Sequence, residues 1–158
     1  MSLTKTYEVF DVVFKDIGTD TNYAAWTNDI NLTLVRGTDY TTLSQTDTSS
    51  AGIHRLNPSI TYDLCIECDL YIDVGSSYTG FIQFRQSTSN KGSISITNFN
   101  TGEWQHLKLT VDGTTVSINV DGVDKNPLTL SSSTWDRVYF QILYNTTVKY
   151  KNFIIYPI

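Results

Sequence analysis

Apolar and polar side chains alternate over short stretches along most of the chain. The alternation is clearest in residues 103–122, where two such stretches are joined through Asp112-Gly113 and followed by Asp121-Gly122. A period of two is typical of strands with one buried face, and Asp-Gly pairs favour the tight turns of β-hairpins. The segment therefore predicts a hairpin whose buried face is formed by Gln105, Leu107, Leu109, Val111, Val116, Ile118 and Val120.

Similar stretches predict further strands elsewhere, whereas helical periodicity is essentially absent. Turn-forming residues, mainly Gly, Asn, Asp and Pro, separate the stretches. Many short strands without helices favour two antiparallel sheets packed as a sandwich, here as a single domain over residues 1–158. The expected strands are residues 7–16, 30–36, 39–44, 51–56, 59–74, 79–86, 92–98, 104–111, 114–120, 135–145 and 148–156.

The long stretch from Tyr62 to Asp73 predicts which residues lie in the core. Its even positions are apolar and its odd positions mostly polar, so the two sets leave opposite faces of one strand. Cys65 and Cys68 therefore point in opposite directions, which favours structural cysteines over a redox pair or half of a zinc site. We expect a core in which Leu64, Ile66, Cys68, Leu70 and Ile72 pack against Leu107, Leu109, Val111, Val138, Phe140 and Ile142.

Three segments resemble those of known domains. Gly102, Trp104, His106 and the two Asp-Gly pairs are similar to the hairpin signature of laminin-G-like and concanavalin A-like jelly rolls. Residues 63–69 and the closing stretch 149–158 are similar to strands of such domains in bacteriophage, archaeal-virus and microbial surface proteins. The resemblance covers the chain from about residue 63 onwards. It implies an all-β, antiparallel two-sheet jelly-roll sandwich of the concanavalin A-like lectin/glucanase type, in which aromatic-rich terminal strands pair.

Composition narrows the range of partners. The chain has 158 residues, a net charge of -5 and only 17% charged residues, so it repels a phosphate backbone and nucleic acid is not expected as a partner. No apolar run approaches the roughly 20 residues of a membrane-spanning helix, so membrane insertion is not expected either. The start, Met1-Ser2-Leu3, is compatible with a domain taken from a longer protein.

The polar face of residues 62–73 carries the strongest catalytic resemblance. Glu67-Cys-Asp69-Leu-Tyr71 resembles the Glu-x-Asp-x-(x)-Glu strand of jelly-roll glycoside hydrolases, which implies Glu67 as nucleophile and Asp69 as the residue that tunes it. The acid/base Glu of that motif is missing, because Tyr71 or Ile72 stands at its position. A glycoside hydrolase or polysaccharide lyase is therefore the less favoured alternative.

Two other expected strands, within residues 81–86 and 135–145, also have one polar face. If they neighbour residues 62–73 in one sheet, carboxylates, amides, guanidinium groups and aromatic rings form a single surface suited to sugars. The other interpretation is that the carboxylates and arginines form surface ion pairs of little energy. The predicted ligand-binding residues are Glu67, Asp69, Tyr71, Gln83, Arg85, Arg137, Tyr139 and Gln141.

The remaining candidates favour structural roles. His54 and His106 are far apart and accompany no nucleophile motif, so a catalytic triad is not expected. Trp104 and Trp26 are interpreted as core or sheet-edge residues, whereas Trp135 is compatible either with a core residue or with an exposed platform on which a sugar ring stacks. The sequence predicts no cofactor. A structural calcium ion held by Asp16 to Asp20, or by the Asp39 and Asp47 stretch, is the alternative.

Together these features favour a non-enzymatic attachment or carbohydrate-binding module of a viral, phage or microbial surface protein. The expected partner is a glycan or cell-surface polysaccharide, and the expected location is the extracellular surface or the virion. The second hypothesis is a structural building block of a virion or surface layer, compatible with a homo-oligomer, because many Thr, Ser and Tyr residues also suit a wet protein contact.

Overall fold

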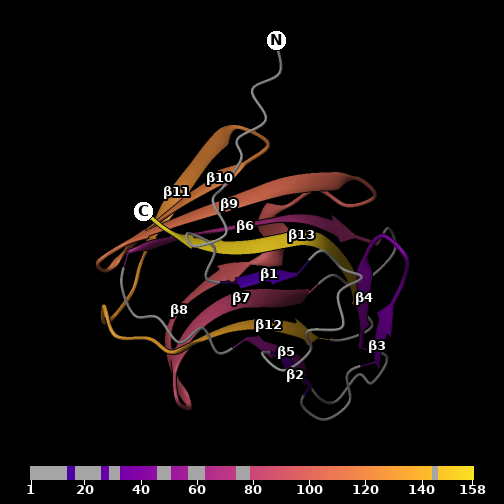
Figure 1. The fold of residues 1–158 in the computed structure, drawn as a ribbon, viewed down its shortest axis with the longest axis horizontal. Coiled ribbons are helices and arrows are strands. Elements are labelled where there is room, and N and C mark those ends of the chain that lie inside the picture. Colours follow the sequence, from indigo (N-terminus) through magenta and orange to yellow (C-terminus); the bar gives the residue numbers. More distant parts are fainter. Residues whose placement is uncertain are drawn as a thin grey trace.

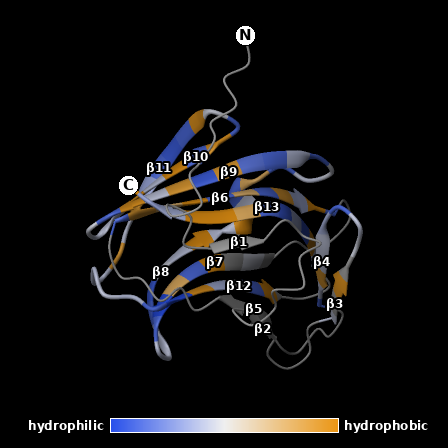
Figure 2. Ribbon diagram, viewed as in Figure 1, coloured by the Kyte–Doolittle hydropathy of each residue, from blue (hydrophilic) through white to orange (hydrophobic). Residues whose placement is uncertain are grey.

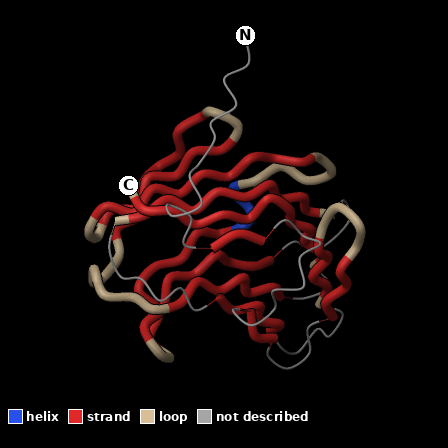
Figure 3. Tube along the Cα trace, viewed as in Figure 1, coloured by secondary structure: helices blue, strands red, loops and turns tan. Residues whose placement is uncertain are grey.

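The computed structural model describes residues 14–16, 26–28, 33–45, 51–56, 63–73, 79–143 and 146–158. These residues form two antiparallel sheets packed face to face, as Figure 1 shows, so the all-β sandwich is confirmed. The 3-10 helix η2 (Ile96–Asn98) is the short helical turn coloured blue in Figure 3. The strands are β1 (Phe14–Asp16), β2 (Trp26–Asn28), β3 (Thr33–Arg36), β4 (Thr41–Ser44), β5 (Ala51–Leu56), β6 (Leu64–Ile72), β7 (Thr79–Gln86), β8 (Ser89–Ser95), β9 (Trp104–Asp112), β10 (Thr115–Val120), β11 (Val123–Thr129), β12 (Arg137–Leu143) and β13 (Thr147–Pro157).

The larger sheet has eight described strands in the order β11-β10-β9-β6-β13-β4-β3, with β1 also paired to β13. The smaller sheet has five described strands in the order β2-β5-β12-β7-β8. The expected pairing of the terminal strands is confirmed over Phe14–Asp16, which lies antiparallel to residues 153–155. The earlier part of the first expected strand, residues 7–13, lies outside the described residues.

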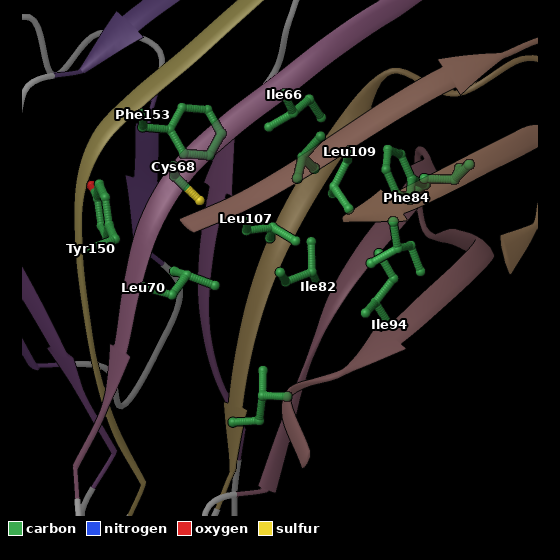
Figure 4. Close-up of a cluster of buried hydrophobic side chains, with 14 of the residues drawn as sticks. Ile66, Cys68, Leu70, Ile82, Phe84, Ile94, Leu107, Leu109, Tyr150 and Phe153 are labelled. Atoms are coloured by element: carbon green, nitrogen blue, oxygen red, sulfur yellow. The ribbon is translucent and has the colours of Figure 1, made fainter. Parts of the chain in front are cut away.

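The core lies between the two sheets and follows the predicted alternation. All five even-numbered residues from Leu64 to Ile72 are buried, and so are Leu107, Leu109 and Val111. β9 is, however, the neighbour of β6 in the same sheet, so these two sets lie side by side. The opposite sheet supplies Ile82 and Phe84 from β7, as Figure 4 shows, and Val138 and Ile142 from β12. The side chain of Phe140 lies outside the described part.

Two tight turns connect β9, β10 and β11. Asp112 pairs with Thr115, so the first turn consists of Gly113 and Thr114 instead of Asp112-Gly113. In the second turn, Asp121 and Gly122 have φ values of 51° and 82°, the conformation that favours Asp-Gly in two-residue hairpins.

The strand after the second turn, β11, was not expected, because its Asn126-Pro127 pair indicates a turn. β11 is the edge of the larger sheet, where a proline is tolerated because one side of the strand has no partner strand. Figure 2 shows mainly hydrophilic residues along it, so it lacks the alternation that predicts a strand.

A bulge interrupts β13. Its register with β6 shifts between Lys151 and Ile154, and Asn152 has a φ of 53°. Tyr150 and Phe153 are both buried, which leaves Lys151 and Asn152 together on the outer side of the sheet. On the other edge of β13, the partner strand changes at the same point from β4 to β1.

Candidate functional site

The eight predicted site residues lie on two different faces of the molecule. Both groups alternate with core residues and point away from the core, so they occupy opposite outer faces of the sandwich (Figure 1). The expectation of one common face is wrong, and so is the alternative that these carboxylates pair with Arg85 or Arg137. Ligand binding by either group stays a prediction. The larger sheet carries Glu67, Asp69 and Tyr71 on β6, and the smaller sheet carries Gln83 and Arg85 on β7 and Arg137, Tyr139 and Gln141 on β12.

The outward side chains of β6, β9 and β13 form rows across the larger sheet, and we call this surface the β6 face. Each carboxylate on β6 has a basic residue directly opposite on a neighbouring strand, an arrangement that stabilises a sheet. The rows are Lys108, Glu67 and Ile154; His106, Asp69 and Lys151; and Trp104, Tyr71 and Lys149.

Glu67 has several hydrogen-bonding and charged partners. The Tyr156 hydroxyl donates to its Oε1 atom, the Lys108 Nζ atom lies 3.1 Å from the same oxygen, and the His106 Nε2 atom lies 3.7 Å from Oε2. Burial raises the pKa of Glu67, but the hydrogen bonds from Tyr156 and Lys108 and the charges of Lys108 and His106 outweigh it. The pKa of Glu67 therefore lies below its ordinary value, and the group is a carboxylate at neutral pH.

Asp69 is held by two strands that approach from opposite sides. His106 on β9 lies with its Nδ1 atom 2.9 Å from Oδ1, and the Asn152 amide on β13 donates to Oδ2 at 2.7 Å. Asn152 reaches Asp69 because the bulge turns it outward. Since the His106 ring also approaches Glu67, this one imidazole links the two carboxylates of the β6 face.

Three aromatic rings gather at one end of the β6 face, and we call them the aromatic cluster: Tyr40, Tyr71 and Trp104. The Trp104 ring lies 5.5 Å from the Tyr71 ring and 5.7 Å from the Tyr40 ring, centroid to centroid. The Lys151 Nζ atom lies 4.4 Å from the centre of the Trp104 ring, and the Lys149 Nζ atom lies 4.6 Å from that of Tyr71. Tyr40 is exposed and the other two rings are half-buried, so the cluster lies at the surface.

A further carboxylate lies beside the cluster. Asp73 Oδ1 accepts a hydrogen bond of 2.8 Å from Lys149, and this bond raises the pKa of the Lys149 amine. The amine therefore stays protonated between the rings and the carboxylate. The surface thus combines aromatic rings with fixed charges of both signs, which suits the apolar C–H faces and the hydroxyl groups of sugars.

The β6 face matches only part of a retaining glycosidase. Such an enzyme needs a nucleophilic carboxylate and a second carboxylic acid with a raised pKa, about 5.5 Å away across the bond. Glu67 is ionised, as a nucleophile requires. Tyr71, at the position of the acid in the resembling motif, belongs to the aromatic cluster and supplies no carboxyl group.

The second group of predicted residues forms what we call the β12 face, the outer side of β7 and β12. The Gln83 amide donates to the Gln141 carbonyl oxygen at 2.7 Å, and Arg85 donates to the Gln83 carbonyl oxygen at 3.1 Å. The Arg85 guanidinium also lies 4.9 Å from the centre of the Tyr139 ring. Gln83 and Tyr139 are buried although they lie outside the core, so Tyr139 is not an exposed sugar platform here.

The burial of Trp135 and of the two cysteines indicates their roles. Trp135 is buried in the core, with its ring 5.1 Å from that of Phe84, so the core interpretation holds for it. Cys65 and Cys68 are both free thiols, and burial raises the pKa of each. These findings agree with structural cysteines.

No group of three or more His, Cys, Asp or Glu side chains in the described ranges is arranged to hold a metal ion. Asp20 and Asp47 of the proposed calcium loops lie outside those ranges. Within the same part of the chain, no helix is long and apolar enough to cross a membrane. An edge groove of about 320 Å³ is present, and it contains none of the predicted site residues; its lining is Asn98, Phe99, Ile118, Val120, Lys125 and Asn126.

Comparison with known proteins identifies the fold. No family model and no curated protein matches the sequence. A sialidase is similar over 93% of this chain, with a TM-score of 0.76 and 9% identity, although the chain spans only 19% of that protein. The carbohydrate-binding module CBM66 from Bacillus subtilis matches 84% of this chain and 95% of its own, with a TM-score of 0.61 and 14% identity. The β-glucanase of Bacillus licheniformis matches 92% and 97%, with a TM-score of 0.64 and 12% identity.

The chain has a concanavalin A-like lectin/glucanase fold. This confirms the fold that the hairpin signature implied. Identities this low show the fold alone, so the concanavalin A-like sandwich is compatible with a binding module and with a hydrolase.

Sequence reasoning missed several residues in and around the aromatic cluster, among them Tyr40, Trp104, Lys149 and Lys151. Trp104 was interpreted as a core or sheet-edge residue, and it lies instead on the outer face beside Tyr71. Its place in the alternating pattern, opposite to Leu107 and Leu109, already indicated an outward direction. Tyr40 is brought to it only by the pairing of β4 with β13, which no local pattern encodes.

Proposed function

We propose that this chain is a non-enzymatic carbohydrate-binding module that attaches a larger surface or virion protein to a glycan outside the cell. The observation that carries this proposal is the aromatic cluster of Tyr40, Tyr71 and Trp104 on the outer side of the larger sheet. The concanavalin A-like fold supports it, because a carbohydrate-binding module of Bacillus subtilis has the same fold.

The cluster has the two properties that a sugar site needs. Its rings offer apolar surface for the C–H faces of a pyranose or furanose ring. Lys149, Lys151 and Asp73 lie at its border and provide charged donors and an acceptor for hydroxyl groups. The Lys151 amine lies near the centre of the Trp104 ring, and its flexible stem allows it to move aside when a sugar stacks on that ring, whereas Lys149 stays bound to Asp73.

The proposal is tested by affinity electrophoresis of the chain in gels that contain soluble polysaccharides. The panel comprises neutral glucans, fructans, mannans and bacterial cell-wall polysaccharide. We expect at least one polymer to retard the parent chain. Replacement of Trp104 by Ala removes the largest ring of the cluster and should weaken this binding about tenfold or more, equivalent to about 1.4 kcal/mol.

Two controls make the result specific. Trp104→Phe retains a ring and should bind more tightly than Trp104→Ala. Val123→Ala removes an exposed apolar side chain from the edge strand and should bind like the parent. The proposal fails if no polymer retards the parent, or if Trp104→Ala and Tyr71→Ala both bind like the parent while retaining its melting temperature.

A hydrolase is the second candidate, favoured by the ionised Glu67 with His106 beside it. The same polysaccharide panel is incubated with the chain and assayed for reducing ends. Activity that Glu67→Gln abolishes, with the fold intact by circular dichroism, would replace the binding module by an enzyme. The absence of any product from every polymer that binds would exclude hydrolysis of those polymers.

A structural building block is the third candidate, because the β6 face has the mixture of rings and paired charges that wet protein interfaces have. Light scattering on dilution distinguishes it. A trimer or dimer that persists at nanomolar concentration, and that Trp104→Ala dissociates, would favour assembly through this face. A monomer at all concentrations leaves the face accessible to a glycan.

A further inference from the structure

Two arginines of like charge lie side by side on the β12 face. The register between β7 and β12 pairs Arg137 directly with Arg85. Residues directly opposite in antiparallel strands have Cβ atoms roughly 5 Å apart, and like charges in such a pair destabilise the sheet unless an anion compensates them. The partners of these two guanidinium groups therefore decide what the pair is for.

Arg85 contacts only neutral acceptors in the described part of the chain. Its donors reach the side-chain carbonyl of Gln83 at 3.1 Å and the backbone carbonyl of Thr88, and its guanidinium lies over the Tyr139 ring. Its Nε atom is buried and has no hydrogen-bond partner among the residues that the structure describes. Carbonyl oxygens orient a guanidinium group without neutralising its charge.

In the described ranges Arg137 has one anionic partner, and that carboxylate also accepts a backbone hydrogen bond. Its Nε atom lies 3.4 Å from Asp136 Oδ1, the same oxygen that accepts a hydrogen bond from the Ser87 backbone N–H at 3.0 Å. Arg137 also donates to the Ser87 carbonyl at 3.1 Å. Among the described residues, one half-exposed carboxylate thus contacts Arg137 and none contacts Arg85, which leaves an excess of positive charge.

The surroundings hold both arginines in place. The turn between β7 and β8, residues 87–88, bonds to each of them through a backbone carbonyl. The amide of Gln83 is fixed by its hydrogen bond to Gln141, so its carbonyl oxygen points to Arg85. Figure 2 shows hydrophilic residues where β12 begins beside this turn. The guanidinium groups are therefore positioned before any ligand arrives, which reduces the entropy lost on binding.

We propose that Arg85 and Arg137 form a binding site for a carboxylate or sulfate group of an acidic polysaccharide. Guanidinium groups bind both oxyanions through paired hydrogen bonds. The site lies on the opposite sheet from the aromatic cluster and does not depend on the glycan site proposed there. A polysaccharide fits better than an acidic protein, because a stable protein contact needs roughly 800 Å² per partner and the positive group here is one residue pair.

The overall charge makes the test selective. With a net charge of -5 the chain as a whole repels polyanions, so binding to one requires a local positive site. Affinity electrophoresis at low salt uses polygalacturonate as the carboxylate probe and dextran sulfate as the sulfate probe. Methyl-esterified polygalacturonate and dextran are their neutral counterparts. We expect at least one polyanion, and neither neutral polymer, to bind the parent through this site.

Arg85→Gln and Arg137→Gln retain hydrogen-bonding side chains and remove the charge. Each should weaken polyanion binding about tenfold or more, whereas Lys125→Gln removes the same charge from the edge strand of the other sheet and should bind like the parent. Trp104→Ala should also bind polyanions like the parent, which separates this site from the aromatic cluster. Melting temperatures identify any variant that fails to fold.

The outcomes are distinct. Binding of polygalacturonate alone assigns the site to uronate carboxylates, and binding of dextran sulfate alone assigns it to sulfate esters. The proposal is overturned if neither polyanion binds, if both folded arginine variants bind like the parent, or if Lys125→Gln weakens binding as much as they do. The last result would indicate a general effect of charge.

Discussion

The two outer faces of the sandwich compensate their charges in different ways. On the β6 face, Glu67 and Asp69 each have a basic side chain and a neutral donor within reach. On the β12 face, Arg85 has only neutral acceptors in the described residues. On the β6 face the carboxylates are paired with basic side chains, and the exposed feature is the aromatic cluster. The β12 face, in contrast, retains uncompensated positive charge. The same fold therefore offers two chemically different surfaces.

The comparison depends on which side chains face outward. Ile66→Asp, one position before Glu67, places a charge in the core, where Ile66 is 2% exposed. We expect it to destabilise the chain by several kcal/mol, a large share of the roughly 5–15 kcal/mol that a domain has. Urea unfolding measures the change.

The matched variant Glu67→Gln lies on the outer side and loses only charge-assisted hydrogen bonds, so about 1–2 kcal/mol is expected. The reverse order of the two variants would show that the faces are assigned one residue out of phase, and the contrast between the β6 and β12 faces would no longer hold.

Because the carboxylates of the β6 face are paired, the stability of the chain should depend on pH in the acidic range. Because the pKa of Glu67 is lower in the folded chain than its ordinary value of 4.5, its contribution to stability is present above that value and is lost as the pH falls through the folded pKa. Melting temperatures measured from pH 6 down to pH 3 should therefore fall more steeply for the parent than for Glu67→Gln. Parallel curves would mean that the partners of Glu67 do not stabilise its charge.

A smaller effect is expected at high pH from Lys149. Its pKa is raised by the hydrogen bond to Asp73, so its contribution to stability is present below the ordinary value of 10.5 and is lost as the pH rises through the folded pKa. Asp73→Asn should cost under about 1 kcal/mol at pH 8, because the pair is near the surface. Its stability should change less than that of the parent between pH 9 and pH 11, as measured by urea unfolding. An equal change in both proteins would contradict the pairing.

The smallest effect concerns the two thiols. Cys68 faces the core and Cys65 faces outward beside Glu67, yet both are fully buried, and burial raises the pKa of each. Neither should react with a thiol reagent in the native chain at pH 8, and both should react on unfolding in urea. Rapid reaction of one thiol in the native chain would show that β6 is accessible at that cysteine, and mass spectrometry would identify which one it is.

Local pattern predicted the faces well because alternation in β6 and β9 is strict. It also predicted the fold class, since strands and turns follow each other with helical periodicity almost absent. It did not predict which strands are neighbours, and Arg85 and Glu67 were placed on one surface although β7 and β6 belong to different sheets. Pairing is set by contacts between residues far apart in the chain, which a period of two does not contain.

The same limit explains the missed site residues. Tyr40 and Trp104 are 64 positions apart, and only the order β9-β6-β13-β4 brings their rings within 5.7 Å. β11 escaped prediction for another reason, because an exposed edge strand with Pro127 has neither the composition nor the alternation of a buried one.

The bulge in β13 accommodates one extra residue in a strand that is buried on one face. Up to Tyr150 the strand is in one phase, and from Phe153 onwards it is in the other, with Asn152 as the inserted residue that separates them. Loss of Asn152 would remove the bulge and leave a regular strand, in which Lys151 and Tyr156 still point outward and Phe153 still points inward. The inserted residue therefore adds one amide to the outer face, where it reaches Asp69, and leaves the core on either side of it unchanged.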